Sequence, residues 1–160
     1  CQLHQEGLPI KVKLIGSVLD SFEKVQEILQ KYPNSKECIE YIAGLPHQQL
    51  IKHYHTSDAF VFASSCENMP IILIEAMSAG LPIISSNSGP MQEVLNDAGL
   101  YFNPRNVSEI KKTMIELFEN HQLRTTLAQQ SYQKTNEYSW ENCSKDTFEF
   151  LVKTAKEYKN

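Results

Sequence analysis

The sequence has little positive charge and no long apolar run. Of its 160 residues, 15 are Lys or Arg and 19 are Asp or Glu, so the formal net charge is −4. This mild acidity argues against a nucleic-acid partner, which requires a basic face. The longest apolar candidate, residues 70–84, contains Glu75, Gly80 and Pro82 and is shorter than the ~20 residues of a membrane-spanning helix.

Cysteine is also sparse. The four cysteines, Cys1, Cys38, Cys66 and Cys143, form no C-x-x-C pair, and their density is too low for a disulfide scaffold. We therefore expect free thiols and a cytoplasmic protein. The chain begins at Cys1 rather than at Met, and we expect it to be part of a longer protein.

Short apolar segments alternate with helical patterns along the chain. We expect strands at residues 10–15, 39–43, 59–63, 82–85 and 99–102, and helices at 19–32, 48–54, 70–79, 91–95, 107–120, 123–137 and 140–156. The segment 59–63 is apolar throughout, which is typical of a strand buried on both faces. This alternation predicts an α/β fold with a parallel sheet, flanking helices and a helical C-terminal tail.

The segments after the predicted strands are rich in Gly, Ser and Asn: residues 16–17, 44–46, 64–68 and 85–89. Ligands of such sheets bind beyond the carboxyl ends of the strands, where the next helix directs its first amides at an anion. The pattern suggests a phosphate-bearing ligand. Strand-to-helix turns favour the same residues in any case, so composition alone leaves both interpretations open.

Several familiar binding motifs are absent. The sequence contains no G-x-G-x-x-G, no G-x-x-x-x-G-K-[ST] and no D-x-D, so we expect neither a dinucleotide site nor a P-loop nor a carboxylate-held metal ion. His53 and His55, two residues apart, diverge on a helix and are expected to be surface residues. Cys66 follows a strand, as a nucleophile would, but without an evident activating His we interpret it as a packed or exposed thiol.

The most informative feature is a pair of carboxylates, Glu67 and Glu75. Glu67 ends the loop after a predicted core strand, and Glu75 lies on the following helix. Helical side chains lean towards the N-terminus of their helix, so both carboxylates could face one ligand held there. Carboxylates accept hydrogen bonds from adjacent hydroxyls, such as those of sugars and ribose.

The residues around this pair form an ordered set of motifs. Residues 67–77 read ENMPIILIEAM, residues 79–84 read AGLPII, and these are followed by Gly89–Pro90 and Glu93–Val94. With Ser57–Asp58–Ala59 before them and Ser139–Trp140–Glu141 after them, they resemble the donor-site signature of the group 1 glycosyltransferases, the family-four retaining enzymes. The resemblance extends over residues 11–140.

The resemblance implies the donor-binding, Rossmann-like half of a GT-B fold, with residues 1–160 forming a donor domain truncated at its N-terminal edge and the N-terminal acceptor domain absent. The full enzyme would transfer a sugar, with retention of configuration, from a UDP- or GDP-sugar to a glycan or lipid-linked acceptor without a metal or other cofactor. The composition, rich in Asn, Lys and Ile and poor in Arg, suits an AT-rich bacterial genome. We therefore expect a role in bacterial O-antigen or capsule synthesis, in the cytoplasm or on the inner face of the membrane. We expect the isolated chain to be inactive.

The resemblance also assigns roles to individual residues. It places Glu67 against the transferred sugar as the catalytic residue and Glu75 on the ribose diol. Backbone amides near Asn68, Met69, Ile71 and Ile72 would hold sugar hydroxyls and phosphate, while Gly44, Leu45 and Pro46 would border the base. Gly16 would allow close approach of the donor.

The sequence departs from the family pattern in three places. Pro70 stands where many family members have Gly, so one backbone N–H is absent from the site. Ser17–Val18 stand where family members often have a second Gly. The family neutralises the donor diphosphate with an Arg and a Lys, but the two arginines here, Arg105 and Arg124, lie outside the site segments. We therefore expect those cations upstream of Cys1. Another GT-B enzyme, such as a sugar phosphorylase or nucleotide-sugar epimerase, and a non-catalytic nucleotide-binding or scaffolding module are alternative interpretations.

Overall fold

A computed structural model describes residues 1–17 and 21–158. The chain divides into two compact units, Cys1–His53 and Tyr54–Asn160. Each unit contains parallel strands and helices in alternation, which confirms the predicted α/β class. The predicted start of the helix at residues 19–32, Leu19, lies outside the described residues.

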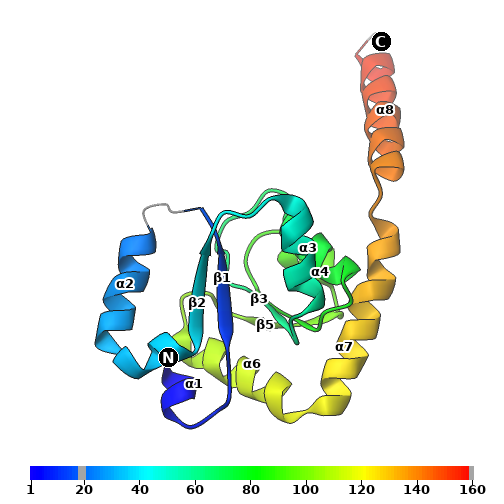
Figure 1. Cartoon of the computed structure of the whole chain (residues 1–160). Coiled ribbons are helices and arrows are strands. Elements are labelled where there is room, and N and C mark those ends of the chain that lie inside the picture. Colours follow the sequence, from blue (N-terminus) through cyan, green and yellow to red (C-terminus); the bar gives the residue numbers. More distant parts are fainter. Residues whose placement is uncertain (18–20, 159–160) are drawn as a thin grey trace. The chain divides into compact units, whose positions relative to one another are not determined.

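The first unit is built on a two-stranded parallel sheet (Figure 1). Its elements are α1 (Gln2–Gln5), β1 (Val12–Gly16), α2 (Ser21–Lys31), the 3₁₀ helix η1 (Pro33–Glu37) and β2 (Ile39–Ala43), and α3 (His47–His55) crosses into the second unit. The rings of Phe22 on α2 and Tyr41 on β2 lie 4.8 Å apart between centroids, so α2 packs on this sheet.

The second unit contains a three-stranded parallel sheet in the order β3-β4-β5. Its elements are β3 (Phe60–Phe62), α4 (Ile71–Ser78), β4 (Ile83–Ser86), α5 (Met91–Leu95), β5 (Gly99–Phe102), α6 (Val107–Glu119), α7 (His121–Lys134), the 3₁₀ helix η2 (Thr135–Glu137) and α8 (Trp140–Glu157). Gly80 ends α4 with a φ of +69°, a conformation that glycine adopts without strain.

The core of the second unit corrects one sequence-based expectation. Ile84 and Phe102, on one face of the sheet, pack with Leu117 of α6 and Leu127 of α7. These helices cover β4 and β5, whereas Val61, paired with Ile84 on the edge strand β3, is 39% exposed. The prediction that β3 is buried on both faces is therefore wrong at Val61, because the helical layer does not enclose this position.

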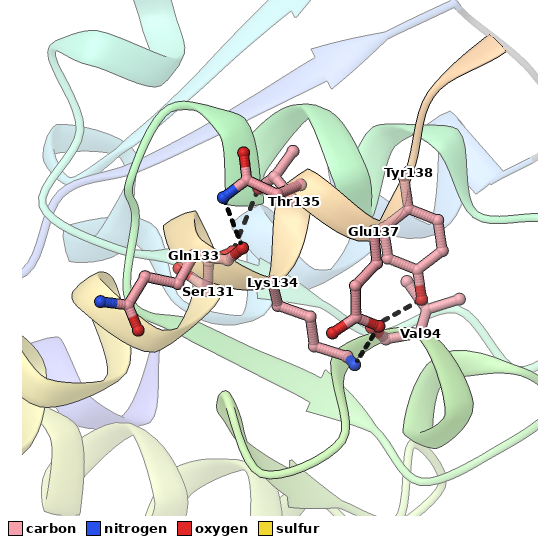
Figure 2. Close-up of polar contacts among 8 residues, drawn as sticks. Val94, Ser131, Gln133, Lys134, Thr135, Glu137 and Tyr138 are labelled. Carbon is pink, nitrogen blue, oxygen red and sulfur yellow. Dashed lines mark hydrogen bonds and ion pairs between the residues drawn. The ribbon is translucent and has the colours of Figure 1, made fainter. Parts of the chain in front are cut away.

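Two hydroxyls attach the end of α7 to the rest of its unit. The Ser131 hydroxyl, fully buried, donates to the Leu81 carbonyl at 2.8 Å. The Tyr138 hydroxyl, just after η2, donates to the Val94 carbonyl on α5 at 3.1 Å (Figure 2). Because the Ser131–Leu81 bond spans 50 residues and the Tyr138–Val94 bond spans 44, both stabilise tertiary rather than local structure.

The last helix, α8, contains no buried residue. Its large apolar side chains are exposed, including Trp140 (82%), Phe148 (68%) and Leu151 (54%). Within the described residues, no helix combines the length and apolarity needed to cross a membrane.

The start of α6 provides a test of local stability. The Asn106 side chain accepts hydrogen bonds from the amides of Ser108 and Glu109, and its own amide donates to the Glu109 carboxylate at 2.8 Å. We expect Asn106→Ala to lower the free energy of unfolding by about 1 kcal/mol, since it removes this N-cap. Urea titration of the variant measures the loss. Asn106→Ser, which keeps an N-cap oxygen without adding charge beside Glu109, should retain most of the stability, and an equal loss in both variants would contradict the capping role.

Candidate functional site

The Glu67 loop is held at the carboxyl end of the sheet in the second unit. After β3, the chain leaves the sheet at Ala63, and the Ser86 hydroxyl at the end of β4 donates to the Ser64 carbonyl at 2.5 Å. The Ser64 hydroxyl in turn lies 3.3 Å from the Cys66 carbonyl. These bonds fix the approach to Glu67, whose side chain is half-buried.

Gly89 packs directly against the main chain of Glu67. A Cβ atom at Gly89 would lie 3.6 Å from the Glu67 carbonyl oxygen and 3.9 Å from its nitrogen, and Gly89 has a φ of +56°. The turn before α5 and the loop after β3 thus meet at the carboxyl ends of neighbouring strands. Two of the motifs quoted from the sequence are therefore adjacent in space, and that edge is where open α/β sheets bind ligands.

Glu75 is half-buried on α4 and receives a hydrogen bond that the sequence did not predict. The Tyr54 hydroxyl donates to Glu75 Oε2 at 3.0 Å. Tyr54 is 7% exposed, and its ring meets that of Phe60 edge-on with 5.9 Å between centroids. Burial, together with the adjacent Glu75 carboxylate, raises the pKa of Tyr54, so its hydroxyl remains protonated and available as a donor.

The segment between the two glutamates turns sharply at Pro70. Pro70 is buried, with φ −81° and ψ 76°, values typical of an inverse γ-turn. Accordingly, the Ile71 amide donates to the Met69 carbonyl at 2.9 Å. The family resemblance predicts that the Ile71 amide holds a ligand. To do so, this amide must first break its hydrogen bond to the Met69 carbonyl.

The side chains around that turn differ in burial. Asn68, Met69, Ile71 and Ile72 are exposed, with Met69 at 48%, Ile71 at 52% and Ile72 at 43%. The first hydrogen bond that Pro70 accepts at the start of α4 comes from the Leu73 amide, at 2.9 Å. Amides before Leu73 belong to the first turn, which carries the positive end of the helix dipole.

The other predicted ligand-binding residues lie together in the first unit. Gly16 is the last residue of β1 and Gly44 directly follows β2, its paired strand, and the Gly44 amide donates to the Gly16 carbonyl at 3.0 Å. A Cβ atom at Gly16 would have no atom within 4 Å, so this position borders open space. Leu45 is half-buried and Pro46 is exposed just before α3. The predicted residues thus fall into one set at the carboxyl ends of β1 and β2 and a second set around Glu67 and Glu75.

Arg124 serves the fold rather than the site. Its guanidinium donates to the Leu117 carbonyl at 2.9 Å and to the Phe118 carbonyl, at the C-terminal end of α6. A cation in this position complements the negative end of the helix dipole. The other arginine, Arg105, is exposed before α6. Neither arginine belongs to the segments that contain the two glutamates.

The cysteines and the histidines of α3 were the other candidate site residues. All four cysteines are free thiols, as predicted, and Cys66 is exposed. His55 is exposed on α3, whereas His53 is half-buried, so the surface prediction holds fully only for His55. Across residues 1–17 and 21–158, no three His, Cys, Asp or Glu side chains come close enough to hold a metal ion.

Comparison with known proteins identifies the family. Residues 2–134 match the family model "Glycosyl transferases group 1", so the chain belongs to this glycosyltransferase family. It is 30% identical over 109 residues to the O-antigen chain mannosyltransferase B of Escherichia coli, an alignment that includes 68% of this chain and 29% of that protein. The chain thus spans about three tenths of the length of this curated relative.

Solved structures show the same fold. HepE of Anabaena, crystallised with UDP, superposes with a TM-score of 0.77 at 18% identity over 90% of this chain and 41% of that one. The C-terminal domain of a group 1 glycosyltransferase, LpcC of Francisella tularensis, superposes with a TM-score of 0.68 at 18% identity over 85% of this chain and 90% of that domain. The architecture is therefore that of GT-B glycosyltransferases.

Proposed function

We propose that this chain is the donor-binding part of a retaining glycosyltransferase of family four. The complete enzyme transfers a hexose from a UDP- or GDP-sugar to a hydroxyl of a glycan or lipid-linked acceptor. The observation that carries the proposal is the packing of Gly89 on the Glu67 main chain, which joins two family motifs at the ligand-binding edge of the sheet. The structure of HepE with UDP supports a nucleotide-sugar donor.

In this proposal each glutamate has a different role. The Glu75 carboxylate binds the ribose diol, and Glu67 orients the donor sugar through its hydroxyls. Amides of the segment that starts α4 face the diphosphate, and Gly16, with open space at its Cα, allows the donor to approach the main chain closely. Gly44, Leu45 and Pro46 border the base.

The chemistry requires positioning rather than a covalent enzyme intermediate. The diphosphate leaves from the face at which the acceptor enters and helps to accept the acceptor proton. The protein orients both reactants and stabilises the leaving group without a metal ion. Arg124 donates to carbonyls at the end of α6, so it does not neutralise the diphosphate in this proposal. The proposal also holds that the 160-residue chain by itself is inactive and binds donor weakly.

The relative named as an O-antigen chain mannosyltransferase supports a role in cell-surface polysaccharide synthesis. The remaining partner is then the acceptor-binding N-terminal domain of the same protein. Location in the cytoplasm, or on the inner face of the membrane, follows from the use of nucleotide-sugar donors.

The ribose role of Glu75 is tested in the full-length protein. We expect Glu75→Ala to weaken UDP or GDP binding by about 10- to 100-fold, because it removes charge-assisted hydrogen bonds to two hydroxyls. Isothermal titration measures the change. Glu116→Ala, which removes an exposed carboxylate on α6, serves as the control and should bind as the unmodified protein does. Unchanged affinity in Glu75→Ala would rule out the ribose assignment.

A further inference from the structure

We infer that Ser86 is a positioning residue for Glu67: its buried hydroxyl holds the loop after β3 so that the Glu67 carboxylate keeps the orientation that sugar transfer requires. This inference rests on the proposed function and adds a residue to it. Ser86 is the last residue of β4, is fully buried, and donates to the Ser64 carbonyl, 22 residues earlier in the chain, at 2.5 Å. All three residues belong to the second unit.

The Ser86 bond begins where the main-chain pairing of β3 and β4 ends. Phe62 and Ser85 are the last register pair of these two strands. Ser64, two residues beyond that pair, is attached to β4 through the Ser86 side chain instead. β4 is itself still paired at this point, because Ser86 is the register partner of Phe102 on β5. The Ser86 hydroxyl is therefore a donor with a fixed position.

The effect of the bond reaches Glu67 in two short steps. The Ser64 hydroxyl donates to the Cys66 carbonyl at 3.3 Å, and that carbonyl belongs to the planar peptide group whose nitrogen is that of Glu67. On the other side, Gly89, three residues after Ser86, packs against the Glu67 carbonyl oxygen and nitrogen. The segment from Ser86 to Gly89 thus holds the loop both at Ser64 and at Glu67.

Burial distinguishes the Ser86 bond from the other bond of the loop. The Ser64–Cys66 bond lies at the surface, where water can replace a lost partner, whereas the Ser86 side chain is shielded from solvent. Without the Ser86 bond, the loop samples more orientations, and Glu67 occupies the productive one for a smaller fraction of the time. Little packing opposes this, since most side chains of the loop are exposed: Ser65, Cys66, Asn68 and Met69.

A purely structural role for the bond makes a different prediction. Ser131 is the matched control, because it is also a fully buried serine of the second unit and donates to a distant carbonyl, that of Leu81, at 2.8 Å. If the Ser86 bond served only the stability of the fold, Ser86→Ala and Ser131→Ala would affect turnover alike. If the bond positions Glu67, only Ser86→Ala lowers turnover, and its effect disappears once the Glu67 carboxylate has been removed.

The experiment uses the full-length protein and measures the release of UDP from UDP-glucose and of GDP from GDP-mannose, with water as the acceptor. The donor that the unmodified enzyme turns over faster is used for every variant. We expect Ser86→Ala to lower kcat about 5- to 10-fold and to change KM for the donor by less than about twofold, because it removes one buried hydrogen bond that orients the loop. Ser131→Ala should keep kcat within about twofold of the unmodified value.

A double variant separates positioning from partial unfolding. In a Glu67→Ala background, Ser86→Ala should lower kcat by less than about twofold, since the hydroxyl acts through the carboxylate. Partial unfolding would instead lower kcat by the same factor with and without Glu67.

Three results would overturn the role of Ser86 and leave the proposed function standing. They are an unchanged kcat in Ser86→Ala, an equal fall in Ser131→Ala, and a fall that persists in full in the Glu67→Ala background. Failure of the unmodified protein to release either nucleotide overturns the proposed function itself, and this inference with it.

Discussion

Glu67→Ala in the full-length enzyme should lower kcat for sugar transfer by about 100- to 1,000-fold and change KM for the donor by less than about threefold. Glu67 is held at the carboxyl end of the sheet by the Ser86–Ser64 bond and by Gly89 against its main chain. Under the proposed function, this fixed carboxylate accepts hydrogen bonds from hydroxyls of the transferred sugar and so keeps the reacting carbon in line with the acceptor. Groups that position the reacting centre affect turnover more than ground-state affinity.

Steady-state kinetics with the donor varied at saturating acceptor measure this split. Glu67→Gln keeps the size and one acceptor oxygen, so we expect it to recover part of the lost turnover. Glu119→Ala removes an exposed carboxylate at the end of α6 and is the control for a general loss of negative charge. A Glu67→Ala enzyme with turnover within threefold of the unmodified enzyme would show that Glu67 does not orient the sugar.

Gly99→Ala should lower the free energy of unfolding of the second unit by about 2–3 kcal/mol. A Cβ atom here would lie 2.2 Å from Leu95 Cδ2 and 3.0 Å from the Ile83 carbonyl oxygen. Leu95 and Ile83 are both fully buried, so Leu95 has no open space into which to move. Moving the Ile83 carbonyl would disturb the β4–β5 pairing, because Gly99 is the register partner of Ile83. Overpacking of this kind typically costs 1–3 kcal/mol.

Gly16→Ala is the matched control for this stability measurement. It places the same methyl group at the end of a strand where no atom lies within 4 Å, and Gly16 does not have a positive φ. We expect its unfolding free energy to stay within about 0.5 kcal/mol of the unmodified value. Urea or thermal unfolding followed by circular dichroism compares the two. A Gly99→Ala protein as stable as Gly16→Ala would mean that α5 and β5 are more loosely packed than the structure shows.

Much of the fold followed from the sequence because glycine and proline mark the ends of its elements. The predicted ranges of β2, α5 and β5 coincide with those observed, Ile39–Ala43, Met91–Leu95 and Gly99–Phe102. The sequence predicts that α7 begins at Leu123, but it begins at His121. Asn120 ends α6 and also caps α7 through the Leu123 amide, and hydrophobic periodicity does not register a cap shared by two helices.

The candidate site was predicted only in part, for a different reason. The two glutamates and Gly89 are evident as motifs, but the contact of Gly89 with the Glu67 main chain depends on which strands are neighbours. The bond between Tyr54 and Glu75 joins two helices across 21 residues, and no local pattern encodes it. One signal did exist: a buried tyrosine hydroxyl usually has a hydrogen-bond partner, and Tyr54 shortly precedes the Ser57–Asp58–Ala59 motif.

The uneven burial around Pro70 has a practical consequence for redesign. Pro70 and Leu73 anchor the segment in the core, whereas Met69, Ile71 and Ile72 project outward beside the two glutamates. Randomising those three exposed positions changes the chemical character of the surface around Pro70 without creating cavities in the core beneath it. A combinatorial library restricted to these three positions should therefore consist mostly of folded proteins and, under the proposed function, would vary the surface beside the donor sugar.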